Sequence, residues 1–201
     1  MPRVLRALLE PVEPLEPLEP LEPLEPTNGV LESCVMSANL IRSAQLTDVD
    51  MLATMMIEVY AEANFPLNRA AAQRTFEQLI RSPQWGGAWI LECDATPAGL
   101  IVLTVMYAME YGGLRGFVDD FYVRPQFRKR GLGAQALATV RAHCLARGIR
   151  ALFVQTGPDN VVAQRVYKRA GFADTGHMLF VQPLAPPIHR TSWTLESAWD
   201  L

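Results

Sequence analysis

The sequence has 201 residues, half of them hydrophobic and 19% charged, which suits one globular domain with a full core. Its formal net charge is -3, but residues 1–35 hold seven glutamates against two arginines, so the rest of the chain is slightly basic. The basic side chains gather in short stretches, so we expect no nucleic-acid partner, which would need a basic face. No apolar run of about twenty residues is present, so we expect no membrane insertion and a cytoplasmic location.

The cysteines and histidines of the chain give no sign of a disulfide framework or a metal centre. Cys34, Cys93 and Cys144 are widely separated, and none belongs to a C-x-x-C or Cys/His cluster. They are predicted to be reduced, structural thiols. The three histidines show no spacing typical of a catalytic dyad or a metal site, so the sequence predicts that no metal is bound.

Residues 10–26 repeat Glu-Pro-Leu, with Val12 as one variation. Proline at every third position excludes a helix and a central strand and favours polyproline II. Such a rod buries nothing, so residues 1–35 are predicted to be a disordered extension, with the folded domain starting at Met36. The alternative is a proline-rich ligand or spacer, but the repeat lacks the basic flank that such ligands carry.

The first elements of the domain are a short strand and two helices. The strand covers residues 40–42, and Thr47 or Asp48 can cap the first helix. Apolar residues at helical spacing follow in that helix: Leu52, Met55, Met56 and Val59. A second helix is predicted over residues 68–81, and Pro83 ends it.

Three strands come next along the chain. Residues 88–93 and 100–105 are rich in β-forming side chains, and the polar segment 94–99 between them predicts a hairpin. The second strand turns at Gly112-Gly113 and pairs with a third strand over residues 114–123. The sequence therefore predicts a run of antiparallel strands.

A loop rich in arginine and glycine leads from this third strand into a helix. Pro125 has no N–H to donate, so it ends the strand, and residues 128–133 then read R-K-R-G-L-G. The helix keeps apolar residues at helical spacing until Gly148, namely Leu132, Ala136, Val140 and Cys144. Glycines let a ligand approach the backbone, and the first N–H groups of a helix have no internal partners. We therefore expect the loop to bind a phosphate.

Two common phosphate motifs do not fit this loop. A Walker loop needs G-x-x-x-x-G-K-[ST], whereas Lys129 precedes the glycines and no hydroxyl follows them. A dinucleotide fingerprint needs a third glycine after Gly131 and Gly133, and Ala136 stands at its position. The pattern that remains is R-x-x-G-x-G after a strand ending in Y-V-x-P.

The last elements are a buried strand, a helix and a final strand. The buried strand covers residues 151–156, and the helix begins at Asp159 or Asn160 and reads N-V-V-A-Q-R-V-Y-K-R-A-G-F. The final strand is predicted over residues 178–184, followed by a C-terminal tail over residues 185–201.

Two motifs of the chain together resemble those of the GNAT acetyltransferases. The first is R-x-x-G-x-G after Y-V-x-P, and the second is N-x-x-A-x-x-x-Y-x-x-x-G-F, matched by Asn160, Ala163, Tyr167, Gly171 and Phe172. The order of strands and helices extends the resemblance over residues 39–184. It implies a layered α/β (α+β) fold over residues 36–184. In such a fold a mixed, mostly antiparallel central sheet is splayed around an acetyl-coenzyme A site, with helices on both faces.

The resemblance also implies which residues hold acetyl-coenzyme A, the expected cosubstrate. The pyrophosphate would lie on the loop residues Arg128, Lys129, Arg130, Gly131, Leu132 and Gly133. Two strands would part after Thr156, which frees the N–H groups of Phe121 and Val123 for the acetyl oxygen and the pantetheine arm. Asn160 completes the expected cofactor site, and Tyr167 is the expected acid that protonates the departing thiolate.

Acetyl transfer to an amine also needs a base, because amines are mostly protonated at neutral pH. Asp119 and Asp120 resemble the Glu-Asp pair of spermidine/spermine acetyltransferases, in which the glutamate is the proposed base. Adjacent residues of a strand point to opposite faces, so at most one of the two faces a given pocket, and we choose Asp119, acting through a water. The alternative is that both carboxylates pair with the basic loop or favour cationic substrates.

The function implied by the resemblance is transfer of an acetyl group from acetyl-coenzyme A to the primary amine of a small molecule, by direct attack in a ternary complex. The acceptor would be a polyamine, an amino acid or an amine-bearing antibiotic. Two alternatives stay open: acetylation of protein N-termini or lysines, and a non-catalytic acyl-coenzyme A sensor.

The first two helices form one wall of the acceptor pocket in the family that the chain resembles. Tyr60, Phe65 and Trp85 are therefore candidates for substrate contact, but we predict that they pack in the core, as aromatic residues at helical spacing usually do. A homodimer is a further expectation. The apolar residues of the tail that are available to dock on the domain or on a second subunit are Trp193, Leu195 and Trp199.

Overall fold

The computed structural model of the protein describes residues 39–62, 65–182 and 184. The predicted extension over residues 1–35, the start of the domain at Met36 and the tail over residues 185–201 lie outside the described residues.

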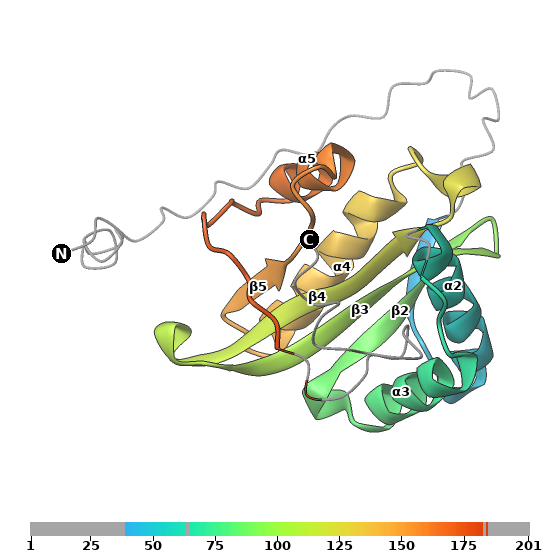
Figure 1. Cartoon of the computed structure of the whole chain (residues 1–201), viewed down its shortest axis with the longest axis horizontal. Helices are drawn as coiled ribbons and strands as arrows, with labels where there is room; N and C mark the ends of the chain where they lie inside the picture. Colours follow the sequence, from blue (N-terminus) through green and yellow to red (C-terminus); the bar gives the residue numbers. More distant parts are fainter. Residues whose placement is uncertain (1–38, 63–64, 183, 185–201) are drawn as a thin grey trace, which may run out of the picture. The chain divides into compact units, whose positions relative to one another are not determined.

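Five strands of the described chain form one sheet in the order β1-β2-β3-β4-β5 (Figure 1). The strands are β1 Asn39–Ser43, β2 Gly86–Cys93, β3 Thr96–Ala108, β4 Gly113–Val123 and β5 Ala151–Val154. The first four pair antiparallel with their neighbours in sequence, and β5 joins β4 in parallel. The mixed, mostly antiparallel sheet that the sequence predicts is therefore confirmed.

The predicted hairpin between β2 and β3 closes with a tight two-residue turn. Asp94 and Ala95 have φ values of 51° and 57°. Two left-handed residues in succession are typical of a type I′ turn, whose twist matches that of the flanking strands. The predicted loop over residues 94–99 is therefore shorter in the structure, because Thr96 already belongs to β3.

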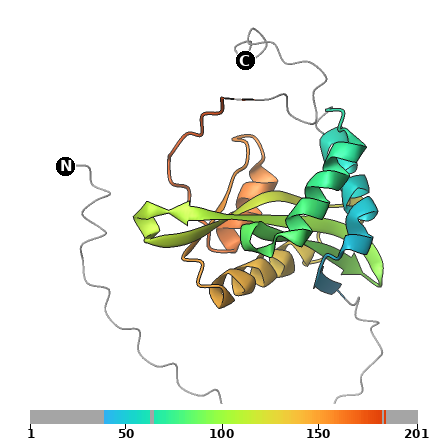
Figure 2. The same ribbon diagram turned by 90° about the horizontal axis from the view of Figure 1, so that it is seen from below.

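Helices cover both faces of the sheet (Figures 1 and 2). The helices are α2 Val49–Glu62, α3 Arg69–Arg81, α4 Leu132–Ala146 and α5 Val161–Arg169. Alternate residues of β3 point to opposite faces, so Leu100 and Val102 pack with α2 and α3, whereas Ile101 and Leu103 pack with α4. The sheet thus separates two cores, and α5 lies against the core that contains α4.

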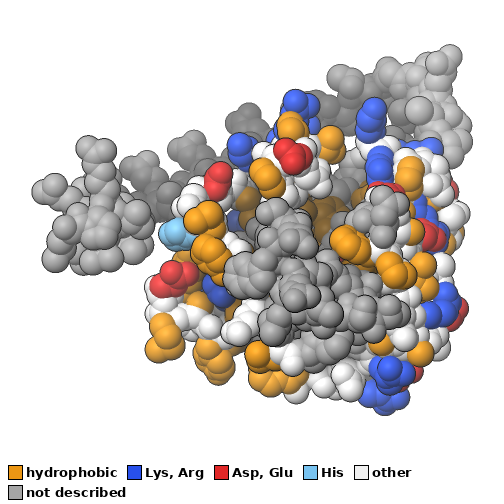
Figure 3. All heavy atoms as spheres, viewed as in Figure 1, with side chains coloured by type: hydrophobic (Ala, Val, Ile, Leu, Met, Phe, Trp, Pro, Cys, Tyr) orange, Lys and Arg blue, Asp and Glu red, His pale blue; other side chains and the backbone are white. Residues whose placement is uncertain are grey.

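Two predicted strand segments differ from the structure. β5 ends at Val154 and not at Thr156. The described residues of the segment 178–184 form no strand, and the apolar ones are exposed: Met178, Leu179, Phe180, Val181 and Leu184. Figure 3 shows exposed hydrophobic side chains on one face of the molecule. A run of β-forming residues becomes a strand only where a neighbouring strand supplies a hydrogen-bonded ladder, and this described segment pairs with none.

Candidate functional site

The two central strands of the site, β4 and β5, separate halfway along β4. Their parallel pairing ends with Val118 opposite Val154, while β4 continues to Val123 with only β3 beside it. The predicted separation is therefore present, although it begins after Val154 and not after Thr156.

The separation leaves two backbone N–H groups of β4 facing the open side. The N–H of Arg124 donates to the Ala98 carbonyl at 2.8 Å, so this N–H points towards β3. Donors alternate along an antiparallel strand, which directs the N–H groups of Phe121 and Val123 away from β3. These are the two residues whose amides the sequence interpretation assigned to acetyl-coenzyme A.

The loop before α4 has the backbone shape of an anion site. Lys129 and Gly131 have φ values of 65° and 81°, and Gly131 is the N-cap residue of α4. The first helical hydrogen bond runs from the Gln135 N–H to the Gly131 carbonyl at 3.1 Å, so the amides before Gln135 lack an acceptor inside the helix. A Cβ built on Gly131 would meet nothing within 4 Å, so the loop is open above this glycine.

The arginines of the loop contact other parts of the protein. The Nη2 of Arg128 donates to both carboxylate oxygens of Glu62 of α2, at 2.8 and 2.9 Å, and its Nε donates to the Val123 carbonyl. Arg130 lies over the Phe127 ring at 5.6 Å and donates to the Cys93 sulfur at 3.7 Å. A phosphate on this loop would therefore meet mainly backbone amides and the exposed Lys129.

The second motif brings Tyr167 to the open half of β4. Its half-buried ring lies 6.4 Å from that of Phe121 and 5.8 Å from that of Phe172, and burial raises the pKa of its hydroxyl. The phenol is therefore protonated at neutral pH and can donate a proton. Asn160 has a structural task in this motif, because its Oδ1 accepts the Ala163 N–H at 3.1 Å and caps α5.

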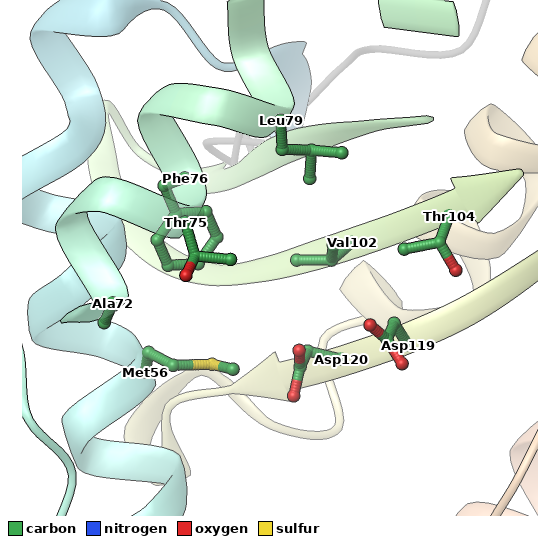
Figure 4. A pocket seen from close by; sticks show the side chains of 9 residues that line it. All are labelled: Met56, Ala72, Thr75, Phe76, Leu79, Val102, Thr104, Asp119 and Asp120. Carbon is green, nitrogen blue, oxygen red and sulfur yellow. The ribbon is translucent and has the colours of Figure 1, made fainter. Parts of the chain in front are cut away.

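A cavity of about 120 Å³ lies between α2, α3 and the strands β3 and β4 (Figure 4). Its wall is apolar apart from two threonines and two carboxylates. The lining residues are Met56, Ala72, Thr75, Phe76, Leu79, Val102, Thr104, Asp119 and Asp120.

Both aspartates face this cavity, which corrects the expectation that they point to opposite faces. Val102 pairs with Asp120 and Leu103 pairs with Val118, so Asp119 is an extra residue in β4. Such a β-bulge interrupts the alternation of side chains, so two successive residues can reach the same face. Figure 4 shows the two carboxylates side by side on the cavity wall.

The two carboxylates lack a basic partner among the described residues. Arg124 and Arg128, which follow β4 in the chain, pair with Glu58 and Glu62, each at 2.8 Å. Arg115 of β4 lies over the Phe153 ring at 4.8 Å. The expected alternative, in which the aspartates pair with the basic loop, is therefore wrong for the part of the chain that the structure describes. Burial raises the pKa of Asp119. Burial and then the charge of Asp119 raise the pKa of Asp120 to about 7.

The aromatic residues of the acceptor wall do not all pack as predicted. Trp85 is 60% exposed and Phe65 is 41% exposed, so neither is a core residue. Tyr60 is half-buried and packs against the core under α2, where burial, Asp120 and Asp119 raise the pKa of its hydroxyl. Phe65 lies in the connection between α2 and α3, and Trp85 ends the short 3₁₀ turn Pro83–Trp85 before β2, so helical spacing carries no information about burial there.

Sequence reasoning missed four residues of this region. Thr75 and Thr104 line the cavity, and Glu58 and Glu62 hold the two arginines. The spacing of the glutamates by four residues on a predicted helix was a usable signal, because it places both carboxylates on one face. The threonines carried no such signal.

Among the described residues, no group of three or more His, Cys, Asp or Glu side chains could hold a metal ion. No described helix is long and apolar enough to span a membrane.

Comparison with known proteins identifies the family. Residues 53–172 match the acetyltransferase (GNAT) family, over more than half of the chain. The chain belongs to the acetyltransferase (GNAT) family. The predicted GNAT N-acetyltransferase domain is confirmed at the level of the family and the fold.

Relatives of this GNAT chain include aminoglycoside acetyltransferases. It is 28% identical to the aminoglycoside N(6')-acetyltransferase type 1 of Stenotrophomonas maltophilia over 76% of this chain and 98% of that protein. It is 33% identical to the enzyme of that name from Salmonella typhimurium over 32% of this chain, a match that spans 44% of the Salmonella protein.

Solved structures of other proteins share this fold. An integron cassette protein from the mobile metagenome of Cole Harbour Salt Marsh is 49% identical, with a TM-score of 0.69 over 75% of this chain and 93% of that one. The aminoglycoside acetyltransferase AAC(6')-Iy, solved with a bisubstrate analog built on coenzyme A, has a TM-score of 0.65 over 74% of this chain and 100% of that one. At 20% sequence identity, this structural likeness shows a common fold and nothing further.

Proposed function

We propose that this GNAT chain transfers an acetyl group from acetyl-coenzyme A to the primary amine of a small molecule, by direct attack in a ternary complex. The observation that carries the proposal is the cavity with two carboxylates that no described basic side chain neutralises. It lies next to the half of β4 that has separated from β5. A cation is the natural ligand of such a pair, and an amine is the acceptor that this family's chemistry requires.

The cosubstrate would bind on the other side of β4 from the cavity. The amides at the start of α4 and the open space above Gly131 suit its pyrophosphate. The N–H groups of Phe121 and Val123 would hold its acetyl oxygen and its pantetheine arm, and Lys129 would add a positive charge. Bound there, acetyl-coenzyme A supplies a thioester carbonyl that the two amides can polarise.

We assign the base to Asp120 and the acid to Tyr167. Asp120 is the more buried carboxylate, and its pKa of about 7 lets it accept a proton at neutral pH. The incoming ammonium group would give one proton to Asp120, directly or through a water, and the neutral amine would attack the carbonyl carbon. The carbon–sulfur bond then breaks and Tyr167 would protonate the departing thiolate. The second proton of the nitrogen would return to the Tyr167 oxygen, directly or through water, and the Asp120 proton would leave to solvent. Asp119, nearer the surface, would hold the incoming ammonium group and would neither accept nor donate a proton in the reaction.

The test is to incubate the full chain with acetyl-coenzyme A and a panel of amines while free thiol is measured. The panel includes small amines, peptides with a free N-terminus and peptides with lysine. We expect thiol release with small amines and matching acetylation of the amine by mass spectrometry. Release with peptides alone would favour a protein acetyltransferase. Tight binding of acetyl-coenzyme A without release would favour a sensor.

A further inference from the structure

The cavity in Figure 4 restricts which amines can be acceptors, an inference that rests on the proposed function. We propose that the acceptor is an amine on an apolar alkyl or aryl body, with one or two amino groups, and not a polyhydroxylated aminosugar. The lining, the charge and the size of the cavity each support this substrate class.

The lining of the cavity offers carbon opposite the carboxylates. Figure 4 shows Phe76 and Leu79 of α3 across the cavity from Asp119 and Asp120. The apolar members of the lining are Met56, Ala72, Phe76, Leu79 and Val102. An ammonium group at the aspartates would therefore place the rest of the molecule against hydrocarbon, where burial of carbon is favourable.

Hydroxyl groups of a ligand would find few partners in this cavity. Thr75 already donates its Oγ1 hydrogen to the Ala71 carbonyl at 3.0 Å, which leaves it as an acceptor. Thr104 is the other hydroxyl of the lining. A sugar ring would bury several hydroxyls here, and a buried hydroxyl without a hydrogen bond is unfavourable. The lining thus disfavours aminosugars.

The charge of the cavity suits one or two ammonium groups. Asp119 and Asp120 are the charged groups of its lining, and the acidic residues Glu58 and Glu62 of α2 are already neutralised by arginines at 2.8 Å. An acceptor with three or more ammonium groups would leave at least one in the cavity region without a carboxylate, and an unpaired cation is costly to desolvate.

The size of the cavity agrees with a single alkyl chain or aryl ring. Its volume of about 120 Å³ is well below the roughly 300–1,000 Å³ of pockets that enclose drug-sized ligands. A molecule with several rings would leave most of its surface outside.

The experiment compares a homologous series of amines on the full chain at saturating acetyl-coenzyme A. The series runs from methylamine to hexylamine, and glucosamine is the hydroxylated six-carbon counterpart of hexylamine. We expect kcat/KM to rise about fourfold per added methylene until the cavity is filled, because each methylene leaves water. Hexylamine should exceed glucosamine at least tenfold. A flat series, with glucosamine or neamine as the better acceptor, would overturn the proposal.

A pair of variants ties the effect to the cavity wall. Leu79→Ser changes a half-buried lining residue, and Ile80→Ser changes a half-buried neighbour on α3 that does not line the cavity. Leu79→Ser should lower kcat/KM for hexylamine about tenfold more than it lowers kcat/KM for methylamine, so that kcat/KM rises less with each added methylene. Ile80→Ser should leave the increase of kcat/KM per methylene as in the wild type, even if both variants lower the melting temperature equally. Equal slopes in all three proteins would contradict the assignment.

Binding measurements separate this inference from the proposed function. Hexylamine and glucosamine are titrated calorimetrically into the full chain in the presence of coenzyme A. If no amine is acetylated but hexylamine binds more tightly than glucosamine in a Leu79-dependent way, the proposed reaction fails and the ligand class stands. If thiol is released with aminosugars alone, the reaction stands and the ligand class fails. If neither amine binds and none is acetylated, both proposals fail.

Discussion

Asp120 illustrates how the surroundings of one residue set its chemistry. An aspartate in water is ionised at neutral pH, but Asp120 is partly desolvated and lies beside a second carboxylate, and its pKa is raised to about 7. Desolvation is the larger cause and the repulsion by Asp119 the smaller. A neighbouring arginine would reverse the shift, but Arg124 and Arg128 are paired with glutamates.

Replacing Asp120 with asparagine should lower kcat/KM about a hundredfold, because general base catalysis typically contributes that much or more. In the wild type, kcat/KM should rise with pH through about 7, as Asp120 loses its proton. The Asp120→Asn variant should lack the inflection near pH 7 that this titration produces. The measurement is kcat/KM from pH 5.5 to 9 with the best amine, and Glu77→Gln on the exposed side of α3 is the control. An unchanged pH profile in Asp120→Asn would assign the base elsewhere.

The same substitution should change how stability depends on pH. The folded chain holds the Asp120 proton more tightly than the unfolded chain, where the pKa of an aspartate is about 4. The wild type should therefore lose stability as pH rises from about 4 to 7, and Asp120→Asn should not. Melting temperatures at pH 5 and pH 8 test this. Relative to the wild type, the melting temperature of the variant should be higher at pH 8 than at pH 5. An equal difference in melting temperature between the two proteins at both pH values would contradict the raised pKa.

Tyr167→Phe removes one hydroxyl and keeps the ring that packs between Phe121 and Phe172. We expect kcat to fall by roughly a hundredfold, towards the lower end of the range for general acid catalysis, because a thiolate is a good leaving group. Acetyl-coenzyme A affinity should stay within a few-fold and the melting temperature should hold. Tyr111→Phe, which alters a ring packed on Phe153 away from the site, is the control. Full activity of Tyr167→Phe would leave this tyrosine with a packing role.

At the scale of elements, β4 joins the two halves of the site. Its bulge at Asp119 turns two carboxylates towards α2 and α3, while Phe121 packs on the opposite face with α4 and α5. Past Val118 the strand has one neighbour, so its outward amides are available. One strand thus presents the proposed acceptor groups on one face and the proposed cosubstrate groups at its free edge.

The start of α4 offers a prediction about cosubstrate binding. Gly131 is unsuitable as a test, because at φ 81° any side chain is strained. Gly133 is helical, and its Cβ would stand 3.5 Å from Phe121, an ordinary contact. Gly133→Val should therefore change stability by less than about 1 kcal/mol. It should still lower acetyl-coenzyme A affinity at least tenfold, since its side chain would stand beside the unpaired N–H groups at the start of α4. Calorimetric titration decides, with the exposed Ala138→Val as the control, and unchanged affinity would contradict the phosphate-loop assignment.

At the scale of the whole molecule, the sheet separates the proposed acceptor cavity from the proposed cosubstrate loop. The two sides adjoin only where β4 and β5 separate. The core under α2 and α3 borders the acidic cavity, and the core under α4 and α5 borders the loop and Tyr167. β4 and β5 separate where these two sides adjoin, so an acceptor and a cosubstrate could approach each other there. A homodimer stays a prediction.

Truncation of the chain to Met36 should leave folding and acetyl-coenzyme A affinity unchanged. The Glu-Pro-Leu repeat has no means of packing into a core, because proline at every third position prevents regular hydrogen bonding and glutamate follows each leucine or valine. The melting temperature and the affinity of the truncated chain are compared with those of the full chain. A clear drop in either would mean that the extension contacts the domain.

The sequence by itself determined the order of the elements and the two motifs. Periodicity places β2, β3, β4 and the four helices, and Pro125, Gly131 and Asn160 mark where elements begin or end. These signals are local, since a proline or a helix cap acts on its own neighbours in the chain. The loop geometry at Gly131 could be predicted for the same reason.

Only the tertiary structure decided what surrounds the reacting groups. The bulge at Asp119 depends on the register between β3 and β4, and Arg128 pairs with Glu62, a residue 66 positions away. The strand predicted over residues 178–184 does not form in the described residues, because no described strand pairs with it. Such outcomes follow from contacts between segments distant in sequence, which fix register, burial and ion pairing together. That is why the carboxylates could be named from the sequence, while their shared cavity and their raised pKa values could not.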